Sequence, residues 1–144
     1  MSTQLRITLA AMSLLLASCS NPFVSEWKEE VGFVVELEPG DFLLLPEGAV
    51  SGADVQIQVR TGGSGNCTRL SRTRVQWETA TSLLITPYND SKWGRAVCNA
   101  NLQFLHHSVT VRFPRAGSYE VRVQARSGQG EAVTVVGSDT VVVR

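Results

Sequence analysis

Short runs in which apolar and polar residues strictly alternate constrain the fold of this chain more than any other feature. The clearest runs are 55–60, which reads VQIQVR, and 119–126, which reads YEVRVQAR. Side chains alternate between the two faces of a β-strand, so a period of two gives a strand one buried and one solvated face. The run at 73–78 alternates in the same way and is expected to point Val75 and Trp77 inward.

Turn signals separate these runs. Proline fixes φ and glycine tolerates positive φ, so strings that contain glycine, with or without proline, predict turns, here at 38–41, 61–66, 114–117 and 127–130. The glycine-rich string at 61–66 is interpreted as a flexible turn, and 133–143 as a hairpin that turns at 137–139. No helical periodicity is seen after the first apolar stretch. Seven to nine short strands at this spacing predict an all-β fold, an antiparallel β-sandwich, over residues 31–144.

One region also resembles a known family. Residues 111–123, VRFPRAGSYEVRV, resemble the penultimate strand region of bacterial Ig-like and PKD-like domains, which carry Gly-x-Tyr-x-Val-x-Val after a turn. The resemblance covers about residues 53–144 and implies an Ig-like sandwich. It also implies that Tyr119 forms a tyrosine corner, with its ring in the core and its hydroxyl bonded to nearby backbone.

The N-terminus has the pattern of an export signal. Arg6 precedes the apolar stretch 7–16, which is shorter than the roughly 20 residues of a membrane-spanning helix. The next residues, LASC at 16–19, resemble the bacterial lipobox. The resemblance implies a cleaved signal at 1–18, diacylglycerol on Cys19 and a lipidated tether at 19–30. An ordinary secretory signal with an incidental Cys19 is the alternative.

Acylation would hold the protein permanently on a membrane, since each buried methylene contributes about 0.8 kcal/mol. The membrane is therefore the first expected partner. Ser20 follows Cys19. In Gram-negative bacteria a serine at this position permits transport to the outer membrane, on its periplasmic side. In other bacteria the expected location is the cell surface.

Assigning Cys19 to lipid leaves Cys67 and Cys98, 31 positions apart. An even pair in an exported chain predicts a disulfide. Two free thiols remain an alternative, and a metal site is disfavoured because no CxxC spacing accompanies the pair. The Cys…Trp…Cys pattern of antibody domains is absent. We therefore expect a disulfide that ties loops together rather than one that crosses the core.

Charge and length limit the function. The chain has 13 basic and 13 acidic residues, and removal of the signal with Arg6 leaves 12 against 13. This balance argues against nucleic-acid binding, which requires a basic stripe or a high pI. A mature chain of 126 residues, 144 less 18, is long enough for one core. No cofactor motif is present.

The segment 88–101 is interpreted as a long polar loop, tied down by Cys98. Loops of this length are often functional. Aromatic, amide and carboxylate side chains in one loop can stack on and hydrogen-bond a sugar or a peptide, so the candidate ligand-binding residues are Tyr88, Asn89, Asp90 and Trp93. The alternative is that Trp93 only covers the core.

Catalysis and metal binding are not expected. His106 and His107 are adjacent, and neighbouring residues of a strand point to opposite faces, so they cannot easily share one metal. No nucleophile elbow of the Gly-x-Ser-x-Gly type appears.

Three classes of function follow. The leading hypothesis is a lipid-anchored, non-catalytic envelope protein that acts as a protein-interaction or structural module, and a small hydrolase inhibitor belongs to this class. The second is a carbohydrate or cell-wall-glycan-binding module that uses the loop of Tyr88 and Trp93. An enzyme is the third, and the least supported.

Overall fold

The computed structural model describes residues 26–94 and 96–144, and these form nine β-strands and no helix. The prediction of an all-β, sandwich-like fold is therefore confirmed. The predicted signal and Cys19 lie outside the described residues. The strands are β1 (Glu26–Val31), β2 (Phe33–Val34), β3 (Leu43–Leu44), β4 (Asp54–Ser64), β5 (Thr68–Trp77), β6 (Ser82–Trp93), β7 (Leu102–Arg112), β8 (Gly117–Arg126) and β9 (Val133–Val143).

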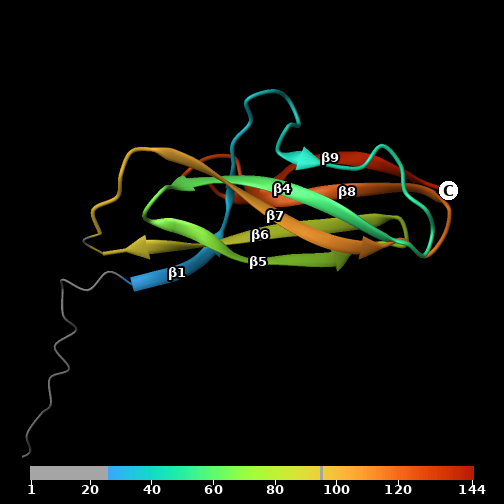
Figure 1. Ribbon diagram of the computed structural model, residues 1–144, viewed down its shortest axis with the longest axis horizontal. Coiled ribbons are helices and arrows are strands. Elements are labelled where there is room, and N and C mark those ends of the chain that lie inside the picture. Colours follow the sequence, from blue (N-terminus) through green and yellow to red (C-terminus); the bar gives the residue numbers. More distant parts are fainter. Residues whose placement is uncertain (1–25, 95) are drawn as a thin grey trace, which may run out of the picture.

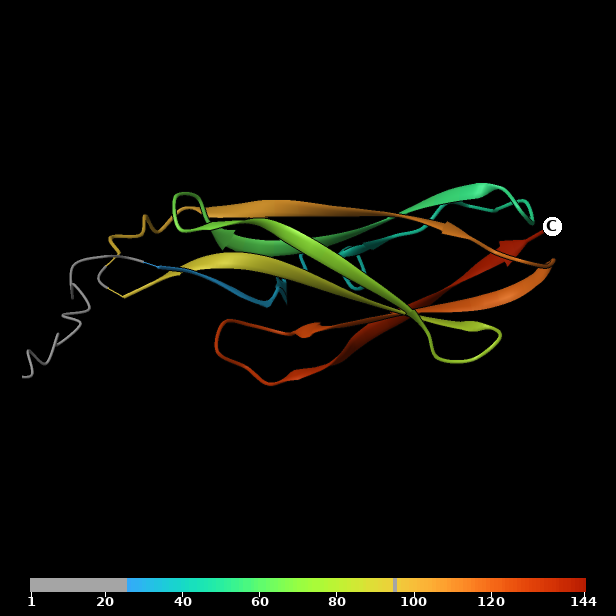
Figure 2. The same cartoon turned by 90° about the horizontal axis from the view of Figure 1, so that it is seen from below.

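The nine strands belong to one hydrogen-bonded sheet that curls until its two halves face each other (Figures 1 and 2). In one half, β4 pairs with β7 on one edge and with β2 and β3 on the other. In the second half, β6 pairs with β5 on one edge and with β1 and β8 on the other, and β9 extends the sheet beyond β8. The pairings of β8 with β6 and with β2 are parallel, and the other six are antiparallel.

The core lies between the two halves, at the alternating positions of the long strands. Its largest fully buried members include Phe113, Ile57, Leu83, Ile85 and Val59. The ring of Tyr119 packs 4.8 Å from the ring of Phe113, between centroids. Its hydroxyl donates to the backbone carbonyl of Arg115 at 3.0 Å. Both features agree with the structure that the family resemblance implies for Tyr119.

β1 corrects the predicted start of the domain. Residues 26–30 were expected in the tether, but they pair with β6 in a register that runs from Glu26 opposite Trp93 to Val31 opposite Tyr88. Their charges did not prevent strand formation, because one edge of β6 supplies a template that a local pattern does not reveal. β1 also begins at the end of the molecule opposite to the C-terminus (Figure 1).

β5 departs from the expected burial. Val75 is 38% exposed and Trp77 is 41% exposed, because β5 hydrogen-bonds to β6 alone. Trp77 still contacts the core, with its ring centroid 5.9 Å from the rings of both Phe113 and Tyr119. It therefore covers the side of the core rather than filling it.

The glycine-rich string proved to be strand rather than turn as far as Ser64. A Cβ on Gly62 would lie 2.5 Å from Val35 and 2.6 Å from Phe33, and a Cβ on Gly63 would lie 2.5 Å from Thr68. These glycines let side chains pack directly against the backbone of β4. The turn itself spans only the residues between Ser64 and Thr68.

The predicted C-terminal hairpin does not form, because β9 is one continuous strand along β8. The register shifts beside Gly137, so the strand accommodates an irregularity rather than a turn. A Cβ on Gly137 would lie 2.6 Å from the ring of Phe42, which is 2% exposed. Gly137 is thus required by packing. Among the described residues, no helix is long and apolar enough to cross a bilayer.

Candidate binding site at the disulfide end

The predicted ligand-binding loop is a strand for most of its length. Residues 88–93 form the end of β6, paired with β1 on one edge and with β5 on the other. The sequence prediction of a loop was wrong because Pro87, Asn89 and Asp90 are poor strand formers in isolation, whereas two neighbouring strands decide the outcome here. Irregular structure begins only at Gly94.

Strand geometry divides the four candidate residues between two faces. Tyr88 and Trp93 are five positions apart and therefore point to opposite faces of β6. The guanidinium of Arg72 lies 4.4 Å from the ring centre of Tyr88, whereas the ammonium of Lys28 lies 5.4 Å from that of Trp93. Asn89 shares the face of Trp93, and Asp90 shares the face of Tyr88. No common platform of Tyr88 and Trp93 exists.

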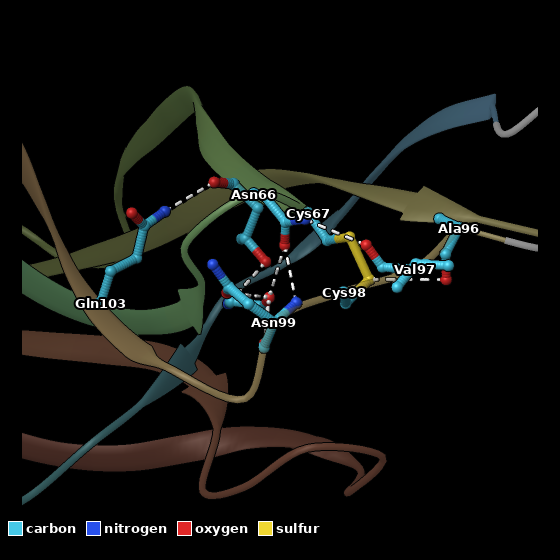
Figure 3. The surroundings of a disulfide bond; sticks show 9 residues. Asn66, Cys67, Ala96, Val97, Cys98, Asn99 and Gln103 are labelled. Carbon is cyan, nitrogen blue, oxygen red and sulfur yellow. Dashed lines mark hydrogen bonds between the residues drawn. A yellow bond between two sulfur atoms is a disulfide. The ribbon is translucent and has the colours of Figure 1, made fainter.

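The disulfide between Cys67 and Cys98 is present and joins the β4–β5 turn to the segment before β7, as expected for a bond between loops (Figure 3). The amide of Asn66 reinforces this link. Its Nδ2 donates to the carbonyl of Val97 at 3.0 Å, and its Oδ1 accepts from the backbone N–H of Asn99 at 2.8 Å. The disulfide end is thereby a connected unit despite its irregular backbone.

A groove of about 410 Å³ lies beneath the disulfide, and we call it the Trp93 groove. Trp93, which is 51% exposed, forms part of its wall. The polar groups that line it include Glu30, Thr68, Asn89, Ser91, Arg126 and Gln129. The structure therefore brings Asn89 and Trp93 to one groove and leaves Tyr88 and Asp90 outside it.

Two oppositely charged residues of this groove, Glu30 and Arg126, were not singled out by sequence reasoning. Arg126 Nη1 lies 3.3 Å from Glu30 Oε2, and both side chains are largely buried. Arg126 Nε is buried and has no hydrogen-bond partner among the described residues. The alternating pattern of β8 predicted that Arg126 lies on the solvated face of the strand. β1 and β8 meet end to end along β6, and this tertiary arrangement brings the pair together.

Asn89 connects the groove to a buried polar cluster. His107 Nε2 lies 2.9 Å from Asn89 Oδ1, so the ring nitrogen donates to the amide oxygen. The other nitrogen, Nδ1, accepts from the hydroxyl of Thr73 at 3.0 Å. Asn89 Nδ2 in turn donates to Thr61 Oγ1 at 3.1 Å. Burial, with a smaller contribution from the charge of His106, lowers the pKa of His107 from 6.5 to about 4.

The opposite face of the same end carries alternating cations and aromatic rings. The guanidinium of Arg69 lies 4.2 Å from the ring centre of Trp27, and the ammonium of Lys92 lies 5.1 Å from it. Arg69 also pairs with Asp90 at 3.0 Å. Trp27 was missed in the sequence because it stands in a charged string that was interpreted as tether.

The described residues contain no group of three or more His, Cys, Asp or Glu side chains arranged to hold a metal ion. His106 is exposed and His107 is buried, so the two rings point apart, as strand geometry predicted. Comparison with protein-family models, with curated proteins and with solved structures finds no match for this chain.

Proposed function

We propose that this chain is a lipid-anchored, non-catalytic module of the bacterial cell envelope, with an Ig-like sandwich that binds an extended segment of another envelope protein. The anchor is the acylated Cys19, and the sandwich begins at Glu26. The observation that carries the proposal is the open edge of β9.

β9 hydrogen-bonds along its length to β8 alone. On the other edge, Ala49 bonds to Val142 and Arg144 near the C-terminus, and no strand among the described residues pairs with the remainder. Val133 is 43% exposed and Val135 is 42% exposed. Open, partly apolar edges attract further strands and are usually protected. Addition of a partner strand is a common mode of peptide recognition.

A groove beside this edge favours the same kind of partner. It has a volume of about 410 Å³ and lies between the segment 36–43 and the middle of β9. Glu36 and Asp139 both line it. An extended segment that carries Lys or Arg would complement these carboxylates, while its backbone paired with β9.

The buried histidine supports a non-catalytic role. His107 is the only histidine of the described residues that is buried, and both its ring nitrogens are hydrogen-bonded inside the sandwich. It is therefore not accessible as a general base for a substrate.

The partner site is tested by capture of envelope proteins with the purified mature protein, followed by binding of the recovered protein in pure form. The double variant Val133→Lys/Val135→Lys should weaken this binding at least tenfold, because each charge disturbs the β9 edge. The matched control, Leu70→Lys/Val75→Lys, alters apolar residues of similar exposure on β5, 47% and 38%, and should bind normally. Equal binding by both variants would refute the β9 edge as the site, and failure to rebind any recovered protein would refute the interaction.

The anchor is tested separately by Cys19→Ser. This variant should stay uncleaved or move from the membrane to the soluble fraction, and the mass added by acyl chains should be lost. Unchanged mass and detergent partitioning would contradict lipidation.

Carbohydrate binding remains the second candidate, in a narrower form. The exposed ring of Trp93, with Ser91 and Glu30 lining the same groove, provides one stacking surface and hydrogen-bonding groups. Titration with soluble cell-wall glycan fragments, read by tryptophan fluorescence, tests it directly. A saturable change that Trp93→Ala abolishes would favour this candidate.

A further inference from the structure

We infer that the end of the sandwich from which the tether leaves is a membrane-contact surface, which inserts Trp27 and Trp93 among the headgroups of an anionic phospholipid surface. The inference rests on the proposed anchor for its geometry. The surface itself is made of residues that the structure describes, and we call it the tether end: Trp27, Lys28, Arg69, Lys92, Trp93 and Val97.

Chain length places this surface near the lipid. Seven Cα–Cα steps separate Cys19 from Glu26, and a fully extended chain of that length reaches at most about 25 Å. Glu26 stands opposite Trp93, and Trp27 stands opposite Lys92. Because β1 belongs to the sheet, the chain between Cys19 and the tether end is shorter than the predicted tether to residue 30. The tether end therefore lies closer to the anchored lipid than that longer tether would require.

The composition of the tether end is unlike that of the rest of the chain. The whole sequence contains two lysines, Lys28 and Lys92, and both lie here. Two of its three tryptophans, Trp27 and Trp93, lie here as well. Tryptophan is enriched at membrane–water interfaces, where its ring is apolar and its N–H is solvated. Lysine extends its charge toward headgroups while its methylene chain stays on apolar surface.

The two tryptophans flank the tip rather than forming one flat face. Trp27 and Lys92 share one face of the β1–β6 pair, whereas Lys28 and Trp93 share the other. Each face thus carries one stacked pair, with the lysine ammonium 5.1 Å from Trp27 and 5.4 Å from Trp93. Val97, which precedes Cys98 at the disulfide (Figure 3), is 89% exposed. This arrangement suits contact through the tip.

The charges at the tip favour an anionic surface. Within the described residues, neither Lys28 nor Lys92 forms an ion pair with a carboxylate. The neighbouring acids Asp90 and Glu29 are neutralised by Arg69 and Arg72, at 3.0 and 2.9 Å. Glu26 is the remaining acid opposite Trp93. Two unpaired lysines are therefore available to lipid phosphates.

Trp77 provides an internal control. It stands nine residues beyond Thr68 along β5, which is about 30 Å at 3.3 Å per residue. Three single-tryptophan forms of the lipidated protein, each with the other two tryptophans changed to Phe, are placed in vesicles of phosphatidylglycerol and phosphatidylethanolamine. Quenching by brominated acyl chains is then measured. The fluorescence of Trp27 and of Trp93 should be quenched and blue-shifted. The fluorescence of Trp77 should be the same in brominated and in unbrominated vesicles.

The charge requirement is tested with Lys28→Gln/Lys92→Gln. An anionic surface attracts each nearby lysine and so favours the orientation in which the tether end contacts the membrane. The variant should therefore shift the equilibrium roughly 30-fold toward orientations without this contact. Quenching should fall correspondingly. Arg112→Gln/Arg115→Gln removes two cations from the opposite end and should leave quenching unchanged. Vesicles of phosphatidylcholine alone should give the low value with every variant.

Mass spectrometry and vesicle flotation keep this inference separate from the anchor. Acylated, floating protein with unquenched Trp27 and Trp93 would refute the membrane contact and leave the anchor intact. Protein without acyl chains would refute the anchor. Binding of this protein to anionic vesicles through the two lysines would then support the membrane contact, and absence of such binding would refute it. Glycan-induced changes at Trp93 without any lipid quenching would also overturn the inference, in favour of carbohydrate.

Discussion

At the scale of single residues, His107 is the most unusual group in the sandwich. A histidine that is 3% exposed stays neutral because the protonated ring would lose its hydration. Its two ring nitrogens are satisfied by Asn89 and Thr73, so the neutral form incurs no unpaired hydrogen bond. The cluster therefore links four strands from β4 to β7 through polar contacts inside an otherwise apolar core.

His107 should make the fold sensitive to acid. Its folded pKa of about 4 is below the ordinary 6.5, so the unfolded chain binds a proton first as the pH falls. The contribution of neutral His107 to the free energy of unfolding is complete above pH 6.5. It is lost as the pH falls to about 4, and the total loss is about 3 kcal/mol. Urea unfolding at pH 7 and pH 5 should show a smaller pH-dependent loss for His107→Gln than for the wild type. His106→Gln, at an exposed position, is the control, and equal losses in wild type and His107→Gln would contradict the assignment.

Tyr119 offers a second test at this scale. Tyr119→Phe removes the hydroxyl that donates to Arg115 at 3.0 Å but keeps the buried ring. We expect a loss of about 1 kcal/mol in the free energy of unfolding, because one carbonyl bond is lost without a cavity. Tyr88→Phe, on a half-buried ring, should change stability less. If Tyr119→Phe left the free energy of unfolding unchanged, this hydrogen bond would not stabilise the turn.

At the scale of elements, β4 shows how glycine can strengthen a strand rather than interrupt it. Gly62 and Gly63 have no side chains, and the space is filled by Phe33 and Val35 on one side and by Thr68 on the other. The strand therefore continues to Ser64, and β2 pairs beside it with Phe33 opposite Gly62. A glycine-rich string within an otherwise alternating run thus marks close packing here.

Gly62→Ala should destabilise the fold by about 1–3 kcal/mol, because the new methyl group would overlap Val35 and Phe33 at 2.5 and 2.6 Å. Gly48→Ala is the control, since its Cβ would meet only a carbonyl oxygen at 3.7 Å. Thermal and urea unfolding of both variants provide the measurement. If the two variants were equally stable, Phe33 and Val35 would have to repack without cost.

At the scale of the whole molecule, the two ends of the sandwich differ. The end at which β1 starts carries the disulfide, the Trp93 groove and both lysines, and the C-terminus lies at the other end (Figure 1). The β9 edge runs between them. The proposed membrane contact and the proposed partner site are therefore on separate surfaces and can be occupied together.

Loss of the disulfide should affect the whole molecule. Cys67→Ala/Cys98→Ala frees a loop closed across 31 positions, which should lower the free energy of unfolding by about 3–4 kcal/mol in the chain-entropy model. Equilibrium unfolding of the oxidised wild type and the double variant gives the difference. Ser127→Ala, on the exposed β8–β9 turn, serves as the surface control. A difference below 1 kcal/mol would indicate that the unfolded chain is already constrained in this region.

Local patterns in the sequence predicted the all-β class, the burial of β4 and β8, and the pairing of Cys67 with Cys98. They could do so because alternation is a property of one strand, and because few cysteines leave few pairings. The tertiary structure alone decided that residues 26–30 and 88–93 are strands, that Tyr88 and Trp93 point apart, and that Glu30 meets Arg126. Each of these depends on a neighbouring strand distant in sequence, whose hydrogen bonds and side chains override the weak preferences of a short polar segment.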